Sequence, residues 1–271
     1  MREKVVVLLP VYIKDDSKHF KIALDSLLHQ THKDLTVFVG CDGPVSDNLE
    51  KVIAEYQDDQ HVKVFRFPEN RGLACVLNDL IAEARKDNIS FLARMDADDV
   101  SLPHRIEKQL TFLQDNPDID VVGGAIEEID SNGNLKNKKI RYPLTHSECR
   151  KFFRYRDPLA HPATFFRMRY FDKSKGYRNE YRKNQDTMLW FDGFLNDCKF
   201  SNLSDVVLQF RVNDSFYSRR DGYKRAKQML KDRIRINKAL KYDVSANIFA
   251  FLMFAMTISP TFIKKFLYKI R

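Results

Sequence analysis

Paired cysteines are the first feature that the sequence lacks. The four cysteines are widely separated and form no CxxC pair, which argues against a zinc-ribbon site and against a disulfide framework. We expect free thiols in a reducing compartment at Cys41, Cys75, Cys149 and Cys198. The N-terminal segment also lacks a signal-peptide pattern, because its apolar run Val5–Leu9 is too short for an h-region and ends at Pro10. These absences predict a cytoplasmic protein.

A long apolar run is also missing, since a membrane-spanning helix needs about 20 apolar residues. The longest candidate lies within residues 244–263 and is apolar at every position only from Ile248 to Met256. We interpret it as a helix that lies peripherally on the inner face of the cell membrane, with its flanking cations on anionic headgroups. The alternative is an ordinary helix packed on the rest of the protein. The flanking basic residues are Lys238, Lys241, Lys264, Lys265, Lys269 and Arg271.

The net charge of +9 is unevenly distributed along the 271 residues. Residues 216–271 contain 14 Lys or Arg and 3 Asp or Glu, whereas the rest of the chain contains 32 and 34. A basic tail of this kind could face nucleic acid or an anionic membrane surface. The apolar block inside the tail favours the membrane surface, because binding to nucleic acid does not require one. We therefore expect no nucleic-acid partner.

Strand and helix patterns alternate through the first 100 residues. This alternation predicts an α/β protein with a mostly parallel sheet and helices on both faces. The β-branched or apolar runs Val5–Leu9, Leu35–Val39, Val62–Phe67 and Ile89–Ala93 predict buried strands. Helical spacing of apolar residues predicts helices over residues 20–28, Asn48–Tyr56 and Leu73–Arg85.

The second half has a less regular pattern. Further helices are predicted at Arg105–Gln114, Thr187–Leu195 and Tyr223–Leu240, and further strands at Asp120–Ile126 and Val206–Val212, with a hairpin turn at Asp130–Asn134. Residues 142–185 lack clear periodicity. We expect one domain over residues 1–215, with two halves over residues 1–100 and 101–215. A basic, partly apolar helical extension would occupy residues 216–271.

Three carboxylates lie within the motif Arg94-Met-Asp96-Ala-Asp98-Asp99, directly after a predicted strand. If the strand continued, Asp96 and Asp98 would point to the same face and could converge on one ligand. Oxygen ligands of this kind suit Mg²⁺ or Mn²⁺, which bind proteins through one or two carboxylates plus substrate phosphates. The alternative is an acidic turn that caps the helix starting near Leu102-Pro103.

Polar signals follow all four predicted strands of the first half, and in a parallel sheet these strand ends share one edge. They begin at Pro10, Asp42, Asn70 and Asp96. The combination resembles the nucleotide-sugar glycosyltransferases of family 2, which have the GT-A fold. The likeness extends over residues 4–220 and includes His161-Pro-Ala-Thr, Gly176-Tyr177, Asn184-Gln185-Asp186-x-x-Leu189-Trp190, Phe210-Arg-Val-Asn-Asp-Ser215 and Ser218-Arg-Arg220. The sequence departs from the family at Gln185, where a Glu usually precedes the catalytic Asp.

The resemblance implies that residues 1–215 form a catalytic domain, with a nucleotide-binding half over 1–100 and an acceptor-binding half over 101–215. It also implies a role for each matching residue. Asp186 would be the general base, Asp98 the metal ligand for Mn²⁺ or Mg²⁺, Asp96 a ribose contact and Asp42 a contact to the uracil edge. The remaining nucleotide-sugar contacts would be Pro10, Val11, Tyr12, Asn70, Arg71, Gly72, Arg94 and Ala97, and the acceptor side would include His161, Gln185 and Trp190. For several of these residues a structural role stays open: a turn for Asp42, a surface position for Arg71, a helix N-cap for Asp186, a structural histidine for His161 and core packing for Trp190.

The function that follows from the resemblance is inverting glycosyl transfer. A hexose or N-acetylhexosamine would pass from a UDP-sugar to a hydroxyl of a lipid-linked saccharide, forming a β-linkage in cell-surface polysaccharide such as O-antigen, capsule or exopolysaccharide. A nucleotidyltransferase or another nucleotide-binding α/β enzyme would explain the acidic motif but not Asp186. A non-enzymatic scaffold with a nucleic-acid arm would leave the apolar block of the tail unexplained.

Overall fold

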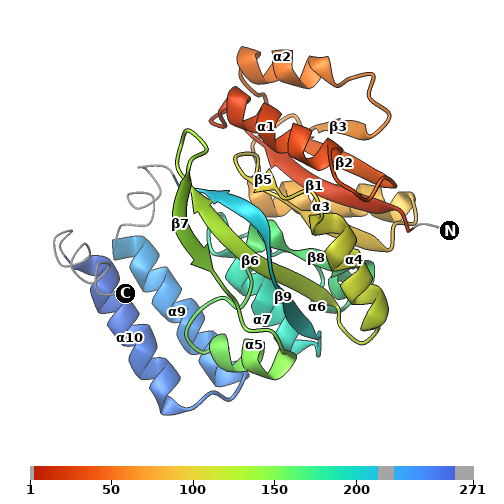
Figure 1. The fold of residues 1–271 in the computed structure, drawn as a ribbon. Coiled ribbons are helices and arrows are strands. Elements are labelled where there is room, and N and C mark those ends of the chain that lie inside the picture. The colour runs from red at the N-terminus through yellow and green to blue at the C-terminus, as the bar shows by residue number, and fades with distance from the viewer. Residues whose placement is uncertain (1–2, 213–222, 260–271) are drawn as a thin grey trace.

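The computed structural model describes residues 3–212 and 223–259. A nine-stranded mixed sheet runs through the molecule in the order β3-β2-β1-β4-β8-β6-β9-β5, with β7 paired to β6. Helices cover both faces of this sheet (Figure 1). The predicted α/β class with helices on both faces is confirmed. The strands are β1 (Val5–Val11), β2 (Leu35–Cys41), β3 (Val62–Arg66), β4 (Phe91–Arg94), β5 (Val100–Ser101), β6 (Val121–Ile129), β7 (Leu135–Ile140), β8 (Phe165–Arg167) and β9 (Phe200–Arg211).

The first four strands are parallel neighbours, as their apolar runs predict. Because side chains alternate along a strand, the two faces of β1 enter two different cores. Val5, Val7 and Leu9 pack on one side with α1, α2 and α4, whereas Val6 and Leu8 pack on the other with α3, α6 and α7. These helices are α1 (Ser17–Leu28), α2 (Asp47–Glu55), α3 (Leu73–Lys86), α4 (Arg105–Asp115), α6 (Met168–Ser174) and α7 (Gln185–Leu195).

Antiparallel pairings enter in the second half of the sheet. Strand β8 lies antiparallel between β4 and β6, while β6 and β9 run parallel and β5 closes the edge antiparallel to β9. The aperiodic residues 142–185 contain short elements that the sequence pattern did not predict. They are α5 (His146–Phe152), the 3-10 turn η1 (His161–Ala163), β8 and α6. Each is too short for a hydrophobic period to be visible.

Two C-terminal helices, α9 (Tyr223–Ala239) and α10 (Val244–Ile258), form a hairpin beside the second half of the sheet (Figure 1). Helix α9 is anchored in the domain, because Ile236 is fully buried in the same core as α7. Helix α10 packs on α9 through Ala246 and Ala250. Within the described ranges, no helix is long and apolar enough to span a membrane. The proposed domain boundary at 215, the motif residues Asn213–Ser215 and Ser218–Arg220, and the end of the apolar segment all fall outside the described residues.

Candidate active site

A cavity of about 870 Å³ opens at the carboxyl ends of the parallel strands. It brings together most of the site residues that the sequence predicts, from four strand ends and from the start of α7. These lining residues are Pro10, Val11, Tyr12, Asp42, Asn70, Gly72, Asp96, Ala97, Asp98, Gln185 and Asp186. Four other predicted residues do not line it: Arg71, Arg94, His161 and Trp190. The carboxyl edge of a parallel sheet is where α/β proteins bind their ligands.

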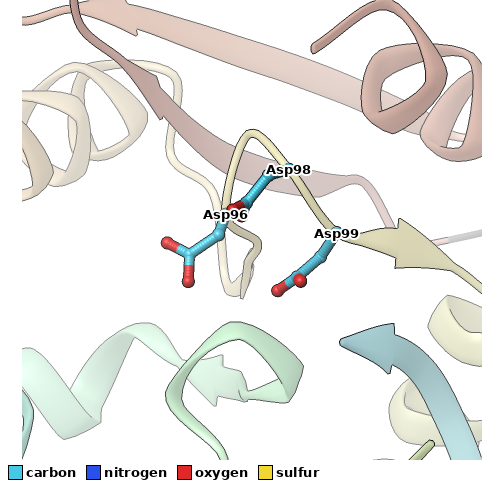
Figure 2. A group of neighbouring side chains, drawn as sticks. All are labelled: Asp96, Asp98 and Asp99. Atoms are coloured by element: carbon cyan, nitrogen blue, oxygen red, sulfur yellow. The ribbon is translucent and has the colours of Figure 1, made fainter. Parts of the chain in front are cut away.

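The acidic motif lies on the short loop that connects β4 to β5, and Figure 2 shows its three carboxylates projecting from that loop. The expectation that Asp96 and Asp98 share a strand face is wrong, because the strand ends at Arg94 and a turn follows. The turn still gathers the carboxylates, with one oxygen of each of Asp96, Asp98 and Asp99 within 4.8 Å of the others. The alternative that the acidic turn caps a helix is also wrong. Helix α4 starts at Arg105, its N-cap residue is His104, and no side chain of the described residues makes a capping hydrogen bond there.

The acidic cluster places carboxylate oxygens where they could hold a cation. Burial, with the neighbouring charge of Asp96, raises the pKa of Asp98 to about 6. Asp99 is fully buried, and burial together with Asp98 raises its pKa well above the usual range. Asp99 accepts a hydrogen bond from the Arg211 backbone N–H at 2.9 Å and does not line the cavity. Asp98 and Asp96 do line it, so their oxygens suit a divalent cation that would relieve this crowding of like charges.

Asp42 organises the loop between β3 and α3. Its carboxylate accepts hydrogen bonds from the backbone N–H groups of Arg71 at 2.8 Å and Gly72 at 2.9 Å. Gly72 has a φ of +95°, which favours glycine, and it is the N-cap residue of α3. Asn70 donates from Nδ2 to the Asp42 carbonyl oxygen at 3.2 Å. Asp42 therefore fixes this cavity wall, and it lines the cavity at the same time.

The side chain of Arg71 points away from the cavity, which corrects the expectation of a diphosphate contact. Its guanidinium pairs with Asp79 on the surface of α3 and lies 5.5 Å from the ring centre of Phe67. The side chain is 44% exposed. The surface alternative therefore holds for the guanidinium, and only the backbone N–H of Arg71 takes part in the site wall, through Asp42.

Asp186 approaches the cavity from the first turn of α7. The N-cap of this helix is Asn184, in a left-handed conformation, so the N-cap alternative for Asp186 is wrong. Its Oδ1 accepts a hydrogen bond from the Thr187 backbone N–H at 2.8 Å. Burial raises the pKa of Asp186 to about 6, with a further contribution from the charge of Asp157, while Arg94 acts in the opposite direction. A carboxyl group with this pKa can accept a proton near neutral pH.

Arg94 is a buried cation behind the cavity wall. Its Nη2 pairs with Asp96, and among the described residues its Nε and Nη1 have no hydrogen-bond partner. Arg105 is equally buried and donates from Nη2 to the Arg94 carbonyl oxygen at 2.7 Å, which holds the end of β4. Arg94 therefore acts on the site through Asp96 rather than from the cavity surface, where the resemblance places it.

His161 and Trp190 are buried behind Asp186, which corrects their placement on the acceptor side. His161 Nε2 shares a hydrogen bond of 2.8 Å with the Tyr177 hydroxyl, and its ring meets Trp190 edge to face. Burial and the charge of Arg94 lower the pKa of His161 well below its usual range, so the ring is neutral. Trp190 is fully buried, in line with the core alternative. Gln185 does line the cavity, and its Oε1 lacks a partner among the described residues.

Several lining residues were not identified from the sequence as site residues. Asp157 lies in the loop between α5 and η1, and Arg182 and Lys183 lie just before α7. The C-terminal helices also reach the cavity, through Arg225 and Met229 of α9 and Met253 and Thr257 of α10. No local motif marks these positions, because tertiary packing alone brings them to the cavity.

Together, the strand-end residues, the acidic cluster and Asp186 have the arrangement expected of a nucleotide-binding α/β enzyme. The model of the family described as glycosyl transferase family 2 matches residues 6–176. The chain belongs to this family and is a glycosyltransferase, as the sequence resemblance predicts.

Two curated relatives and one solved structure illustrate the likeness. The O-antigen biosynthesis glycosyltransferase WbnJ of Escherichia coli is 31% identical over 78% of this chain and 81% of its own. An E. coli UDP-Gal:alpha-D-GlcNAc-diphosphoundecaprenol beta-1,3-galactosyltransferase is 29% identical over 98% and 95%. A mannosyltransferase of Pyrobaculum calidifontis, solved with GDP-Man and Mn²⁺, superposes with a TM-score of 0.66 at 16% identity over 95% and 74%. This last likeness confirms the GT-A fold.

Proposed function

We propose that the protein is an inverting glycosyltransferase of cell-surface polysaccharide synthesis. It moves a hexose or N-acetylhexosamine from a UDP-sugar to a hydroxyl of a saccharide acceptor and forms a β-linkage. The observation that carries this proposal is that Asp98 and Asp186, which are 88 positions apart in the sequence, line one cavity. The E. coli relatives, one of O-antigen biosynthesis and one that uses UDP-Gal, support the choice of pathway and donor.

The donor lies on the side of the cavity that the parallel strands build. Tyr12 offers an aromatic face to the base, and Asp42 lies beside it with unused lone pairs for the uracil edge. Asp96 is held by Arg94 and faces the ribose. Asp98, together with Asp96, would hold Mn²⁺ or Mg²⁺, whose charge offsets that of the leaving diphosphate. The Mn²⁺ complex of the P. calidifontis enzyme is consistent with such a cation.

Asp186 supplies the base for the reaction. Its carboxylate removes the proton from the acceptor hydroxyl as that oxygen forms a bond to the anomeric carbon. The bond from this carbon to the diphosphate oxygen breaks, and its electron pair leaves with UDP. Attack on the face opposite the leaving group inverts the anomeric configuration. A positioned base typically contributes on the order of 10²–10⁴-fold in rate.

The acceptor enters from the side of α9 and α10, and we propose that it is linked to a lipid. The outer face of α10 exposes Val244, Ile248, Phe251, Leu252 and Ile258, which recur at helical spacing. The opposite side of α10 lines the cavity with Met253 and Thr257. An apolar stripe flanked by lysines suits an anionic bilayer surface, so the protein would lie peripherally on the inner face of the cell membrane. The relative that uses a diphosphoundecaprenol acceptor supports this proposal.

The decisive experiment is a panel of UDP-sugars incubated with Mn²⁺ and an undecaprenyl-diphosphate-linked N-acetylhexosamine, followed by measurement of UDP release and of the glycan product. Release of UDP that depends on the acceptor, with a β-linked product, is the expected result. Release of sugar 1-phosphate, with transfer of UMP to the acceptor, would instead identify a nucleotidyltransferase. Vesicle binding tests the membrane part: Leu252→Ser should weaken binding to anionic vesicles, whereas Leu135→Ser, at an exposed leucine of β7, should not.

A further inference from the structure

The acceptor side of the cavity contains a second carboxylate, that of Asp157, beside Asp186. It comes from the loop between α5 and η1, and not from the position before Asp186, which is Gln185. One residue links the two carboxylates. The backbone N–H of Thr187 donates to Asp186 Oδ1 at 2.8 Å, and the hydroxyl of Thr187 donates to Asp157 Oδ2 at 2.8 Å. The two acidic groups are therefore held in a fixed relation to each other.

The C-terminal helical hairpin completes this arrangement. Arg233 of α9 forms an ion pair with Asp157, its Nη2 lying 3.0 Å from Oδ1. The same guanidinium donates from Nη1 to the Phe153 carbonyl oxygen at 2.9 Å and lies over the Phe153 ring. Its side chain is only 17% exposed, so solvent screens the pair weakly. A helix outside the region matched by the family model thus reaches the group next to the base.

We propose that Asp157 is a positioning residue that sets the proton affinity of Asp186, and that Arg233 adjusts this effect from the C-terminal helix. The inference rests on the proposed function, in which Asp186 is the base. A negative charge close to a carboxylate favours the protonated form, which makes it a stronger base near neutral pH. Consistent with this, Asp157 is the largest electrostatic contributor to the raised pKa of Asp186 after burial.

Other charged groups also surround Asp186. Arg94 lies behind it and favours the ionised form, and the Tyr177 hydroxyl faces the same region. Arg182 and Lys183 lie on the preceding loop and line the cavity. None of these residues bonds to Thr187 or Asp157. Removing Asp157 and removing Arg233 should therefore shift the titration of Asp186 in opposite directions.

The test is a ¹³C NMR titration of the Asp186 carboxyl in the full-length protein, assigned by its loss in Asp186→Asn. Asp157→Asn removes a negative charge and should lower the midpoint by about one pH unit. Arg233→Met keeps an apolar stem but removes the cation that offsets Asp157, so the midpoint should rise. Arg154→Met is the matched control, because Arg154 also ties the domain to the hairpin, through Asp243 at 2.8 Å, yet neither residue lines the cavity.

The acidic limb of the transfer rate should move in the same directions as the NMR midpoints. An unchanged midpoint in Asp157→Asn, or shifts of the same sign in Asp157→Asn and Arg233→Met, would overturn the inference. If Asp157→Asn does not fold, Arg233→Met alone still tests the inference. An Arg233–Asp157 ion pair with only a structural role would leave the Asp186 midpoint unchanged, whereas the inference requires it to rise. Failure of the proposed function looks different: Asp186→Asn would then retain transfer.

Discussion

The two sides of the cavity, one where we propose that the nucleotide lies and one where we propose that the acceptor lies, are built in different ways. The nucleotide side consists of strand ends in a regular parallel sheet, where Asp42 fixes the loop at the start of α3 through two backbone N–H groups. The acceptor side consists of an aperiodic loop with Asp157, the start of α7, and helices α9 and α10. Regular strand ends, with Asp42 holding the adjoining loop, therefore shape the nucleotide side, whereas side-chain contacts between irregular segments and the C-terminal helices shape the acceptor side. Substitutions on the acceptor side should therefore lower the transfer rate, whereas substitutions on the nucleotide side should lower the affinity for UDP.

The largest effect is expected on the acceptor side, from Asp186→Asn. The variant keeps the size of the side chain but cannot accept the acceptor proton, so the transfer rate should fall by about 10²–10⁴-fold. Binding of UDP, measured by calorimetry, should be unchanged because the donor side is intact. Rapid transfer by this variant would show that the base lies elsewhere in the cavity. A loss of UDP binding would instead show that the two sides are not separate.

Asp42→Ala should produce the next largest effect, on the nucleotide side. The backbone N–H groups of Arg71 and Gly72 would lose their acceptor, and an unsatisfied buried donor costs about 1–3 kcal/mol. The affinity for UDP should fall by roughly 10–100-fold, since 1.4 kcal/mol corresponds to a factor of ten. The pH dependence of the remaining activity should not change. Asp47→Ala, at an exposed carboxylate of α2, is the control and should bind UDP normally.

The nucleotide half could be predicted from the sequence because its signals are local. Apolar runs such as Val5–Leu9 gave the strands, and their parallel order placed Asp42 and Asp98 at one edge. The acceptor half could not be predicted in the same way. His161 was expected at the acceptor, but it is buried against Tyr177, and Asp157 reaches the cavity from a loop without periodicity. Such positions depend on contacts between segments that no single stretch of sequence records.

The acidic cluster offers a smaller effect that depends on pH. Because the pKa of Asp98 is raised to about 6, a proton competes with the cation below that pH. The affinity for Mn²⁺, measured by calorimetry, should fall about tenfold for each pH unit below 6. In the absence of a cation, pH affects the folding stability in the opposite direction. The folded state holds this proton more tightly than the unfolded state does, so stability should decline as the pH rises from about 4 to 6. An affinity that is flat between pH 5 and 7 would contradict this account.

The smallest effect should come from Arg71→Ala, although Arg71 belongs to the nucleotide side by sequence. Its guanidinium pairs with Asp79 on the surface, and an exposed ion pair of this kind contributes about 0.2–1 kcal/mol. The backbone N–H that donates to Asp42 survives the substitution, so the loop at the start of α3 should keep its conformation. The affinity for UDP should stay within about twofold of wild type. A tenfold loss would mean that the arginine turns towards the diphosphate when the donor binds, and that its guanidinium contributes directly to the nucleotide side.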